Sequence, residues 1–127
     1  MSIRIKQCGF TLIEILVVMA IVALLITLAV PRYFGSLEKS KETVLRETLA
    51  TTRDALDKFY ADNGKYPDSL DALVSKKYLR AMPFDPVTDS NSTWATIPPD
   101  DVEKGLVADI RSGADGNARD GKPFKEL

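Results

Sequence analysis

Residues 10–30 form one apolar segment, FTLIEILVVMAIVALLITLAV, and this segment limits what the chain can fold into more than any other feature. Its 21 residues match the ~20 that an α-helix needs to cross the hydrocarbon core of a membrane. Glu14 is the only charged residue in it. Because the chain has 127 residues, fewer than 100 remain for a folded domain with a small core. The segment predicts a single-pass membrane anchor followed by one small polar domain.

A secretory signal peptide is the usual interpretation of a short basic stretch before an apolar run. Its apolar core has about 7 to 15 residues and is followed by a cleavage site of small residues. Here the apolar run is longer, and Pro31-Arg32-Tyr33 follows it. A lipoprotein signal does not fit either, because Cys8 precedes the apolar run. The residues therefore favour a helix that is kept over a signal peptide that is removed.

Glu14 is costly in such a helix, because an ionised side chain at the bilayer centre costs about 2.5 to 3.5 kcal/mol, and somewhat less near an end. Such residues usually have a partner. A cut between Gly9 and Phe10 would create an α-amino group, with a pKa near ~8, one helical turn from Glu14. This cation would compensate the carboxylate, within one chain or between neighbours. The alternative is an ordinary anchor that tolerates a glutamate near its end.

The stretch Gly9-Phe10-Thr11-Leu12-Ile13-Glu14 resembles the processing motif of type IV pilins and type II secretion pseudopilins. The resemblance implies that prepilin peptidase, a membrane aspartyl protease, cleaves after Gly9 and methylates the new amine of Phe10. It also implies that Glu14 serves assembly by pairing with the terminal amine of a subunit already in the filament. Residues 1–9 would then be a cleaved leader, and residues 10–34 a transmembrane helix that becomes the filament core.

Pro31 lies just beyond the apolar segment. It lacks an N–H and its ring clashes with the carbonyl of Thr27, so a kink or a locally melted helix is expected there. In pilin-like proteins a proline is also typical of this position, where it would help the helix bend as subunits leave the membrane. The alternative is that it only marks the membrane exit. Both interpretations stay open.

Residues 35–127 are predicted to form a soluble head domain, after a break in the helix near residues 35–36. Apolar residues spaced by threes and fours predict an amphipathic helix over residues 37–62 that ends at residues 63–64. The expected apolar stripe consists of Val44, Leu45, Leu49, Thr52, Leu56, Phe59 and Tyr60. This stripe is expected to pack against the sheet of the same chain.

A short helix is expected over about residues 68–75, with Asp68 or Ser69 as its N-cap. Two strand-like runs predict a small antiparallel sheet within about residues 93–127. The runs are residues 93–97 and 106–110. The expected fold is therefore α+β and pilin-like: a long N-terminal helix, membrane-spanning in its first half, packed on a small C-terminal antiparallel sheet.

Three later segments, at residues 66–67, 83–86 and 109–116, are similar in order to parts of the major pseudopilins. Many type IV pilins close a C-terminal loop with a cysteine pair, which this chain lacks because Cys8 is its only cysteine. The resemblance therefore implies a pseudopilus subunit that assembles with its own copies, minor pseudopilins and an inner-membrane platform to push secreted cargo outward. The alternative is a type IV pilin, or a minor pilin-like protein that caps a filament or binds a ligand.

The resemblance also implies a calcium ion in the C-terminal loop. Calcium favours six to eight oxygen ligands, and Ser112, Asp115, Asn117 and Asp120 would supply several of them. The family pattern ends in a later acidic pair, whereas this chain has RDGK at residues 119–122. The alternative is that aspartate, asparagine and glycine are ordinary turn-forming residues here. Calcium is the one cofactor expected.

Composition argues against other function classes. The chain has no histidine and one cysteine, which leaves few nucleophile-and-base pairs, so an enzyme is not expected. A net charge of −1 does not favour a nucleic-acid partner.

The resemblance implies the bacterial inner membrane, with the C-terminal domain in the periplasm. Counting positive charges on the two sides of the segment favours the opposite orientation. These charges are Arg4 and Lys6 before it, and Arg32, Lys39, Lys41 and Arg46 after it.

Overall fold

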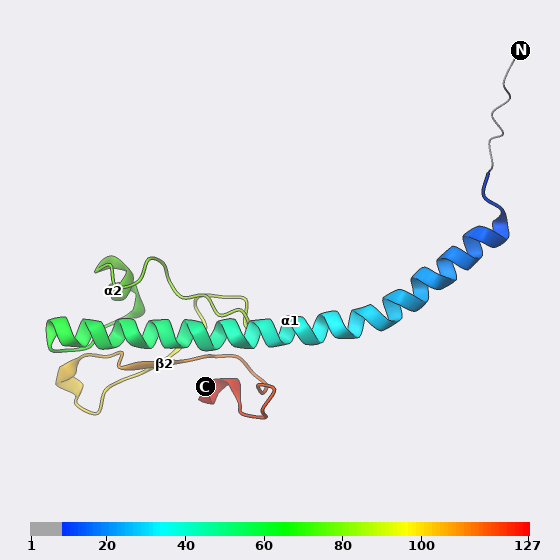
Figure 1. Cartoon of the computed structure of the whole chain (residues 1–127). Coiled ribbons are helices and arrows are strands. Elements are labelled where there is room, and N and C mark those ends of the chain that lie inside the picture. The colour runs from blue at the N-terminus through cyan, green and yellow to red at the C-terminus, as the bar shows by residue number, and fades with distance from the viewer. Residues whose placement is uncertain (1–8) are drawn as a thin grey trace, which may run out of the picture. The chain divides into compact units, whose positions relative to one another are not determined.

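The computed structural model describes residues 9–127 (Figure 1). The chain divides into two compact units, and the boundary lies between Leu37 and Glu38. Helix α1 contributes residues to both units, and in the second unit it is followed by short elements and loops. The elements in chain order are α1 (Leu12–Asn63), α2 (Leu70–Ser75), β1 (Ala95–Ile97), the 3-10 helix η1 (Val102–Lys104), β2 (Asp109–Arg111) and the 3-10 helix η2 (Phe124–Glu126).

The first unit contains the apolar beginning of α1. This helix is long and apolar enough to cross a membrane, with an 18-residue window of mean hydropathy 3.0 of which no part is buried. Its large apolar side chains are exposed around the whole circumference, for example Leu12, Ile13 and Leu16. A helix that is apolar on all sides is typical of one surrounded by lipid or by other helices. The predicted apolar N-terminal helix is confirmed.

The predicted break near residues 35–36 is wrong, because α1 includes both Gly35 and Ser36. A glycine inside a helix costs only about 1 kcal/mol relative to alanine, and the neighbouring turns contain good helix formers such as Leu37 and Glu38. Pro31 also lies inside α1, so the helix is not melted at that residue. The kink at Pro31 stays a prediction.

Helix α1 ends where the sequence predicts. Gly64 has a φ of +71°, a left-handed conformation that glycine adopts without steric cost. Its N–H donates to the carbonyl of Tyr60 over 2.8 Å, and the side-chain amide of Asn63 donates to the carbonyl of Phe59 over 2.9 Å. These bonds satisfy two of the carbonyls that every helix end leaves without an intrahelical partner.

The core of the second unit lies along one stripe of α1. The predicted stripe is confirmed except at its edges, since Val44 is 47% exposed and Tyr60 is only half-buried. Each residue of a helix is turned by about 100° from the next, so Val44 points away from the face on which Leu45 lies. The buried residues of α1 are Leu45, Leu49, Thr52, Ala55, Leu56 and Phe59.

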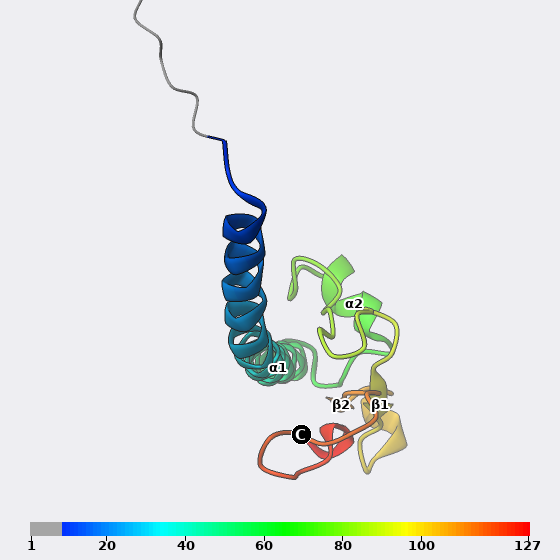
Figure 2. The ribbon, with the colours of Figure 1, turned by 90° about the vertical axis from the view of Figure 1, so that its right-hand side faces the viewer.

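The other elements of this unit cover that stripe. Helix α2 contributes Leu70 and Leu73 to the core, and Ile110 of β2 is fully buried. Ser69 is the N-cap residue of α2, as predicted, but its side chain makes no capping hydrogen bond. Figure 2, in which this part of α1 is seen nearly end-on, shows α2 and the strands on one flank of the helix. The expectation that the stripe packs within its own chain is confirmed.

The sheet is antiparallel, as expected, but smaller than the sequence pattern suggests. It has two strands of three residues each, β1 and β2, with Thr96 opposite Ile110. Residues 112–127 form a loop and the 3-10 helix η2 instead of further strand. Three glycines and a proline interrupt this stretch, and such residues weaken strand pairing. The α+β class is confirmed.

Arg53 ties α1 to the sheet through its guanidinium group. Nε donates to Oδ1 of Asp109 over 2.7 Å, and Nη2 donates to the carbonyl oxygens of Ile110 and Leu127 over 2.9 and 2.7 Å. One side chain thus holds β2 and the last residue of the loop against the helix. Hydrogen bonds to a charged donor of this kind are stronger than neutral ones.

Substituting Leu56 tests the position of the stripe. Leu56→Ala should lower the free energy of unfolding by about 2 to 5 kcal/mol, because it opens a cavity in a fully buried site. The matched control Val44→Ala should change it by no more than about 0.5 kcal/mol, since Val44 is exposed. Denaturation of the full chain in detergent, followed by the fluorescence of its one tryptophan, Trp94, measures both. Equal losses in the two variants would contradict the assignment of the buried face.

Candidate functional site

The peptide bond between Gly9 and Phe10 lies outside α1, which begins at Leu12. Phe10 is 82% exposed, and a Cβ added to Gly9 would meet no atom within 4 Å. A peptidase must bind its substrate in an extended form, so a bond that is exposed and non-helical is accessible to it. The structure therefore places the predicted cleavage residues where cleavage requires no unfolding of the helix.

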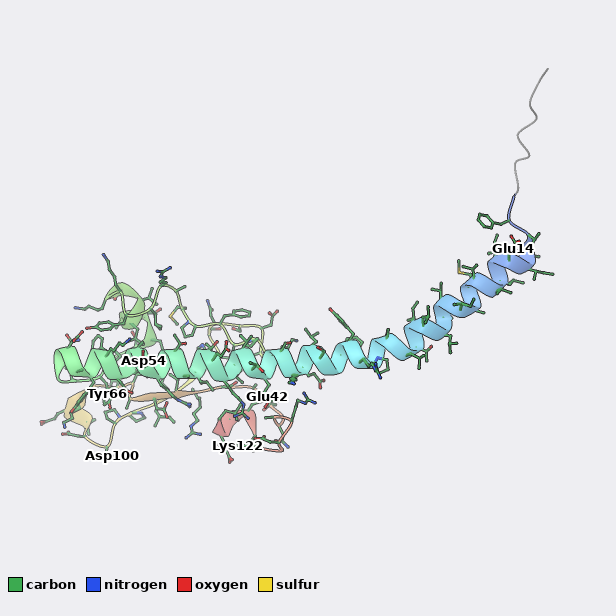
Figure 3. All side chains as sticks on the ribbon, viewed as in Figure 1. Glu14, Glu42, Asp54, Tyr66, Asp100 and Lys122 are labelled. Atoms are coloured by element: carbon green, nitrogen blue, oxygen red, sulfur yellow. The ribbon has the colours of Figure 1, made fainter. Side chains whose placement is uncertain are left out.

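Glu14 takes part in a capping box at the start of α1. The N–H of Glu14 donates to Oγ1 of Thr11 over 3.2 Å, and the N–H of Thr11 donates to Oε2 of Glu14 over 3.3 Å. Such reciprocal bonds satisfy two N–H groups that have no partner inside the helix. A carboxylate at this place also interacts favourably with the helix dipole. Glu14 is labelled in this first turn in Figure 3.

This arrangement gives Glu14 two separate properties. As the third helical residue it stabilises the first turn, a role that glutamine fulfils as well. As the one charged residue of the apolar segment it carries a negative charge that only a cation compensates. The capping bond engages Oε2, so within residues 9–127 the other carboxylate oxygen remains for a second donor. The cap and the charge are therefore separable by substitution.

In the C-terminal loop, Ser112 is fully buried and its hydroxyl donates to Oδ2 of Asp85. Asp85 is itself buried, and its other oxygen accepts the N–H groups of Val87 and Thr88 over 2.8 and 3.3 Å. The Ser112 oxygen also accepts the N–H of Ala114 over 3.1 Å. A buried carboxylate needs such donors. Ser112 therefore anchors β2 to the loop around Asp85.

The residue after Ser112 is Gly113, and steric crowding explains why a glycine stands there. A Cβ at this position would lie 2.2 Å from the carbonyl oxygen of Thr93, closer than two non-bonded atoms can approach. The backbone after β2 passes directly against the backbone before β1. Glycine is required at this crossing by space, and its φ is not in the left-handed region.

The other three predicted calcium ligands each have a different neighbour. Asp115 pairs with Nζ of Lys125 over 3.0 Å, and the backbone of Asn117 bridges to that of Pro123. Asp120 pairs with Nη2 of Arg46 over 3.3 Å. Among residues 9–127, no three acidic, histidine or cysteine side chains gather into a group that could hold a metal ion. Two of the four predicted ligands, Asp115 and Asp120, thus pair with cations of the protein, and calcium binding stays a prediction.

Asp120 is stabilised in its charged form. The pKa of its carboxyl is lowered chiefly by the hydrogen bond that Oδ1 accepts from the N–H of Lys122; desolvation opposes this shift, and the charge of Arg46 and its hydrogen bond add to it. A lowered pKa in the folded state adds stability above the ordinary value near 3.8, and this stability is lost as the pH falls below it.

Three features of these sites did not follow from the sequence analysis. The capping role of Thr11 has a local signal, since threonine three residues before glutamate at the start of an apolar run is the capping-box pattern. Asp85 has a weaker local signal, because aspartate is common in turns, where its side chain accepts N–H groups two and three residues later, as it does here. The pair of Arg46 and Asp120 has none, because 74 residues separate its members.

Comparison with known proteins agrees with the motif at the N-terminus. Residues 4–30 match a family model described as the prokaryotic N-terminal methylation motif. Curated relatives include the type II secretion system core protein G of Vibrio cholerae, 32% identical over 87% of this chain and 83% of the relative. The proteins of the same name from Pseudomonas aeruginosa and Aeromonas hydrophila are 36% and 34% identical, over 65% and 64% of this chain and 70% and 68% of the relatives. No solved structure matches the chain.

Removing the hydroxyl of Thr11 tests the capping box. Thr11→Ala should speed hydrogen exchange at the amide of Glu14 by about 2- to 30-fold, which corresponds to the about 0.5 to 2 kcal/mol that an N-cap side chain contributes. Thr11→Ser keeps a hydroxyl and serves as the control, with exchange close to that of the natural chain. Exchange spectra of the full chain in detergent micelles measure this. An unchanged rate in Thr11→Ala would rule out the cap.

Proposed function

The chain belongs to the family of type II secretion system core protein G, the major pseudopilins, and on this premise we propose that it is a structural subunit of the pseudopilus. In this role it assembles with copies of itself into a filament that drives protein export. The observation that carries the proposal is the methylation motif at residues 4–30, which leads into an exposed apolar helix of mean hydropathy 3.0. A helix of this kind serves first as a membrane anchor and then as a filament core.

Processing is the first step of the proposed function. Prepilin peptidase removes residues 1–9 as a leader and methylates the amine of Phe10. The position of the bond between Gly9 and Phe10 supports this step, because Phe10 is exposed and α1 begins only at Leu12. Cleavage leaves a positively charged amine two residues before the first residue of α1. A cation at the beginning of a helix is unfavourable to the dipole, so this amine is better placed beside a carboxylate.

Glu14 supplies that carboxylate in the proposed assembly step. While Glu14 stays without a cation in a membrane or in a bundle of apolar helices, its charge is costly. Pairing with the methylated amine of Phe10 on a neighbouring subunit offsets this cost for both groups. The capping box supports the step, since it holds Glu14 at the very start of α1, where the amine of a neighbour arrives. The correct axial position of a subunit is then the one in which every amine has a carboxylate.

The environment of the subunit follows from the same premise. The chain is anchored in a membrane by α1, and we propose that this is the bacterial inner membrane, crossed once, with residues 38–127 in the periplasm. Minor pseudopilins, the inner-membrane assembly platform and the secreted cargo are its proposed partners, together with prepilin peptidase. A role without catalysis is proposed, since the family is that of a filament subunit. The alternative of a type IV pilin or a ligand-binding minor subunit is not favoured, because the relatives are core proteins G.

Mass spectrometry of the membrane fraction tests processing. In cells that contain the peptidase, the mature chain should begin at methylated Phe10, and Gly9→Val should leave the precursor uncut because a side chain enters the cleavage site. Gly35→Val is the matched control, since a Cβ at either glycine meets no atom within 4 Å, and it should be processed normally. Natural chains that keep residues 1–9 would contradict the proposal.

The charge of Glu14 is tested by a variant that keeps the cap. Glu14→Gln should be processed normally and should yield at least about tenfold fewer filaments, because an amide caps the helix but does not neutralise an amine. Glu47→Gln, which changes another exposed glutamate of α1, is the control. Filaments are counted by electron microscopy after shearing from cells. Normal numbers of filaments in Glu14→Gln would show that the charge is not required.

A further inference from the structure

We infer that the C-terminal loop, residues 112–127, is closed onto α1 by positively charged side chains of the protein, which take the place that a divalent cation would have. The loop contains three acidic and three basic residues, so it is neutral by itself. A calcium site normally combines several negatively charged ligands, and nearby cations oppose it. The inference does not depend on the proposed filament function, since it concerns the folding of one chain.

The first fastening joins the loop to α1 through Glu42 and Arg46. Arg46 bridges Oε1 of Glu42 at 3.2 Å and Oδ2 of Asp120 at 3.3 Å, and Oε2 of Glu42 accepts the backbone N–H of Arg119 at 3.1 Å. Two side chains of α1 therefore bind the loop: Arg46 binds the carboxylate of Asp120, and Glu42 accepts the N–H of Arg119. Figure 3 labels Glu42 where α1 meets the loop that carries Lys122.

The side chain of Glu42 makes this fastening stronger than an ordinary surface pair. It is only 14% exposed, whereas those of Arg46 and Asp120 are 45% and 57% exposed. Isolated exposed pairs contribute little, but here two hydrogen-bonded contacts share one partly buried carboxylate. Glu42 and Arg46 are one helical turn apart, so the same face of α1 presents both to the loop. The arrangement is a network of charges and not a single pair.

The second fastening lies within the loop. Nζ of Lys125 contacts Oδ1 of Asp115, and the N–H of Phe124 donates to the carbonyl of Gly116. The carbonyl oxygens of Ala118 and Lys122 are likewise occupied, by the N–H groups of Gly121 and Ala118. Calcium sites in loops use backbone carbonyls together with carboxylates. In this loop the carbonyls of Gly116, Ala118 and Lys122 already accept N–H groups, and the carboxylate of Asp115, 97% exposed, is in contact with Lys125.

The interior of the unit gives the loop a reason to close without an ion. Ala118 and Leu127 are both part of the hydrophobic core, so closing the loop buries apolar surface against α1. Asp85 and Ser112 hold the beginning of the loop, and Arg53 holds its end through the carbonyl of Leu127. Arg46 and Lys125 therefore need only fix the exposed middle part.

Melting of the full chain in detergent tests whether an ion is needed. The melting temperature should be the same within error in millimolar calcium and in excess chelator, because a ligand that does not bind the folded state does not raise its stability. A higher melting temperature in calcium, or slower hydrogen exchange in the loop when calcium is added, would overturn the inference. This measurement uses the natural chain, so it does not depend on the folding of a variant.

Substitution of Arg46 tests the fastening itself. Arg46→Gln should raise hydrogen exchange at the amides of Ala118 and Gly121 by about 2- to 5-fold, in the range of a charged pair of this exposure. Lys58→Gln is the matched control, because Lys58 forms an i,i+4 pair with Asp54 at 2.9 Å on the same helix but does not contact the loop. It should leave the loop amides unchanged.

A double-mutant cycle with Asp120→Asn separates the pair from the two single effects. If Arg46 acts through Asp120, the double variant should exchange no faster than the faster single variant, because each substitution removes the same contact. Additive effects, or loop exchange in Arg46→Gln that equals that of the natural chain, would overturn the role of Arg46. Molar salt should speed loop exchange in the natural chain and have a smaller effect in Arg46→Gln.

Discussion

Burial of one stripe of α1 is the interaction on which the folded part of this chain depends. None of the other elements is longer than six residues, so within residues 9–127 no other helix or strand is long enough to be stable alone. Leu45, Leu49 and Leu56 are almost completely buried, and α2, β2 and the C-terminal loop each contribute an apolar residue to the same core. The small elements therefore exist because α1 offers them a common surface.

The exposed side chains of α1 have a different significance in the two units. In the first unit the helix is apolar all round and buries nothing within the described chain, which leaves its surface for lipid or for other copies of the helix. In the second unit its remaining surface carries charged residues such as Glu42, Arg46 and Arg53, and these bind β2 and the C-terminal loop of the same chain. One element thus serves as an anchor in one unit and as a scaffold in the other.

Two carboxylates, Glu14 and Asp85, have different surroundings. Glu14 is the one charge of the apolar segment, and it is held at the first turn by Thr11. Asp85 is a buried carboxylate whose oxygens accept three hydrogen bonds from the protein. Both have a structural role that is visible in the hydrogen bonds. The two differ in their surroundings: Asp85 is buried in the core of the second unit, whereas Glu14 lies in the apolar segment, and the proposed assembly role rests on that position.

The sequence by itself determined the features that depend on neighbouring residues. These are the apolar helix, its end at Gly64, and the α+β class. Local pattern did not exclude helix at residues 35–36, because a glycine and a serine weaken a helix without ending it. Only the tertiary structure decided that Val44 is exposed, that Ser112 binds Asp85 and that Arg46 binds Asp120, since the members of these pairs are 27 and 74 residues apart. Contacts at such separations depend on how the elements pack, and no local spacing encodes them.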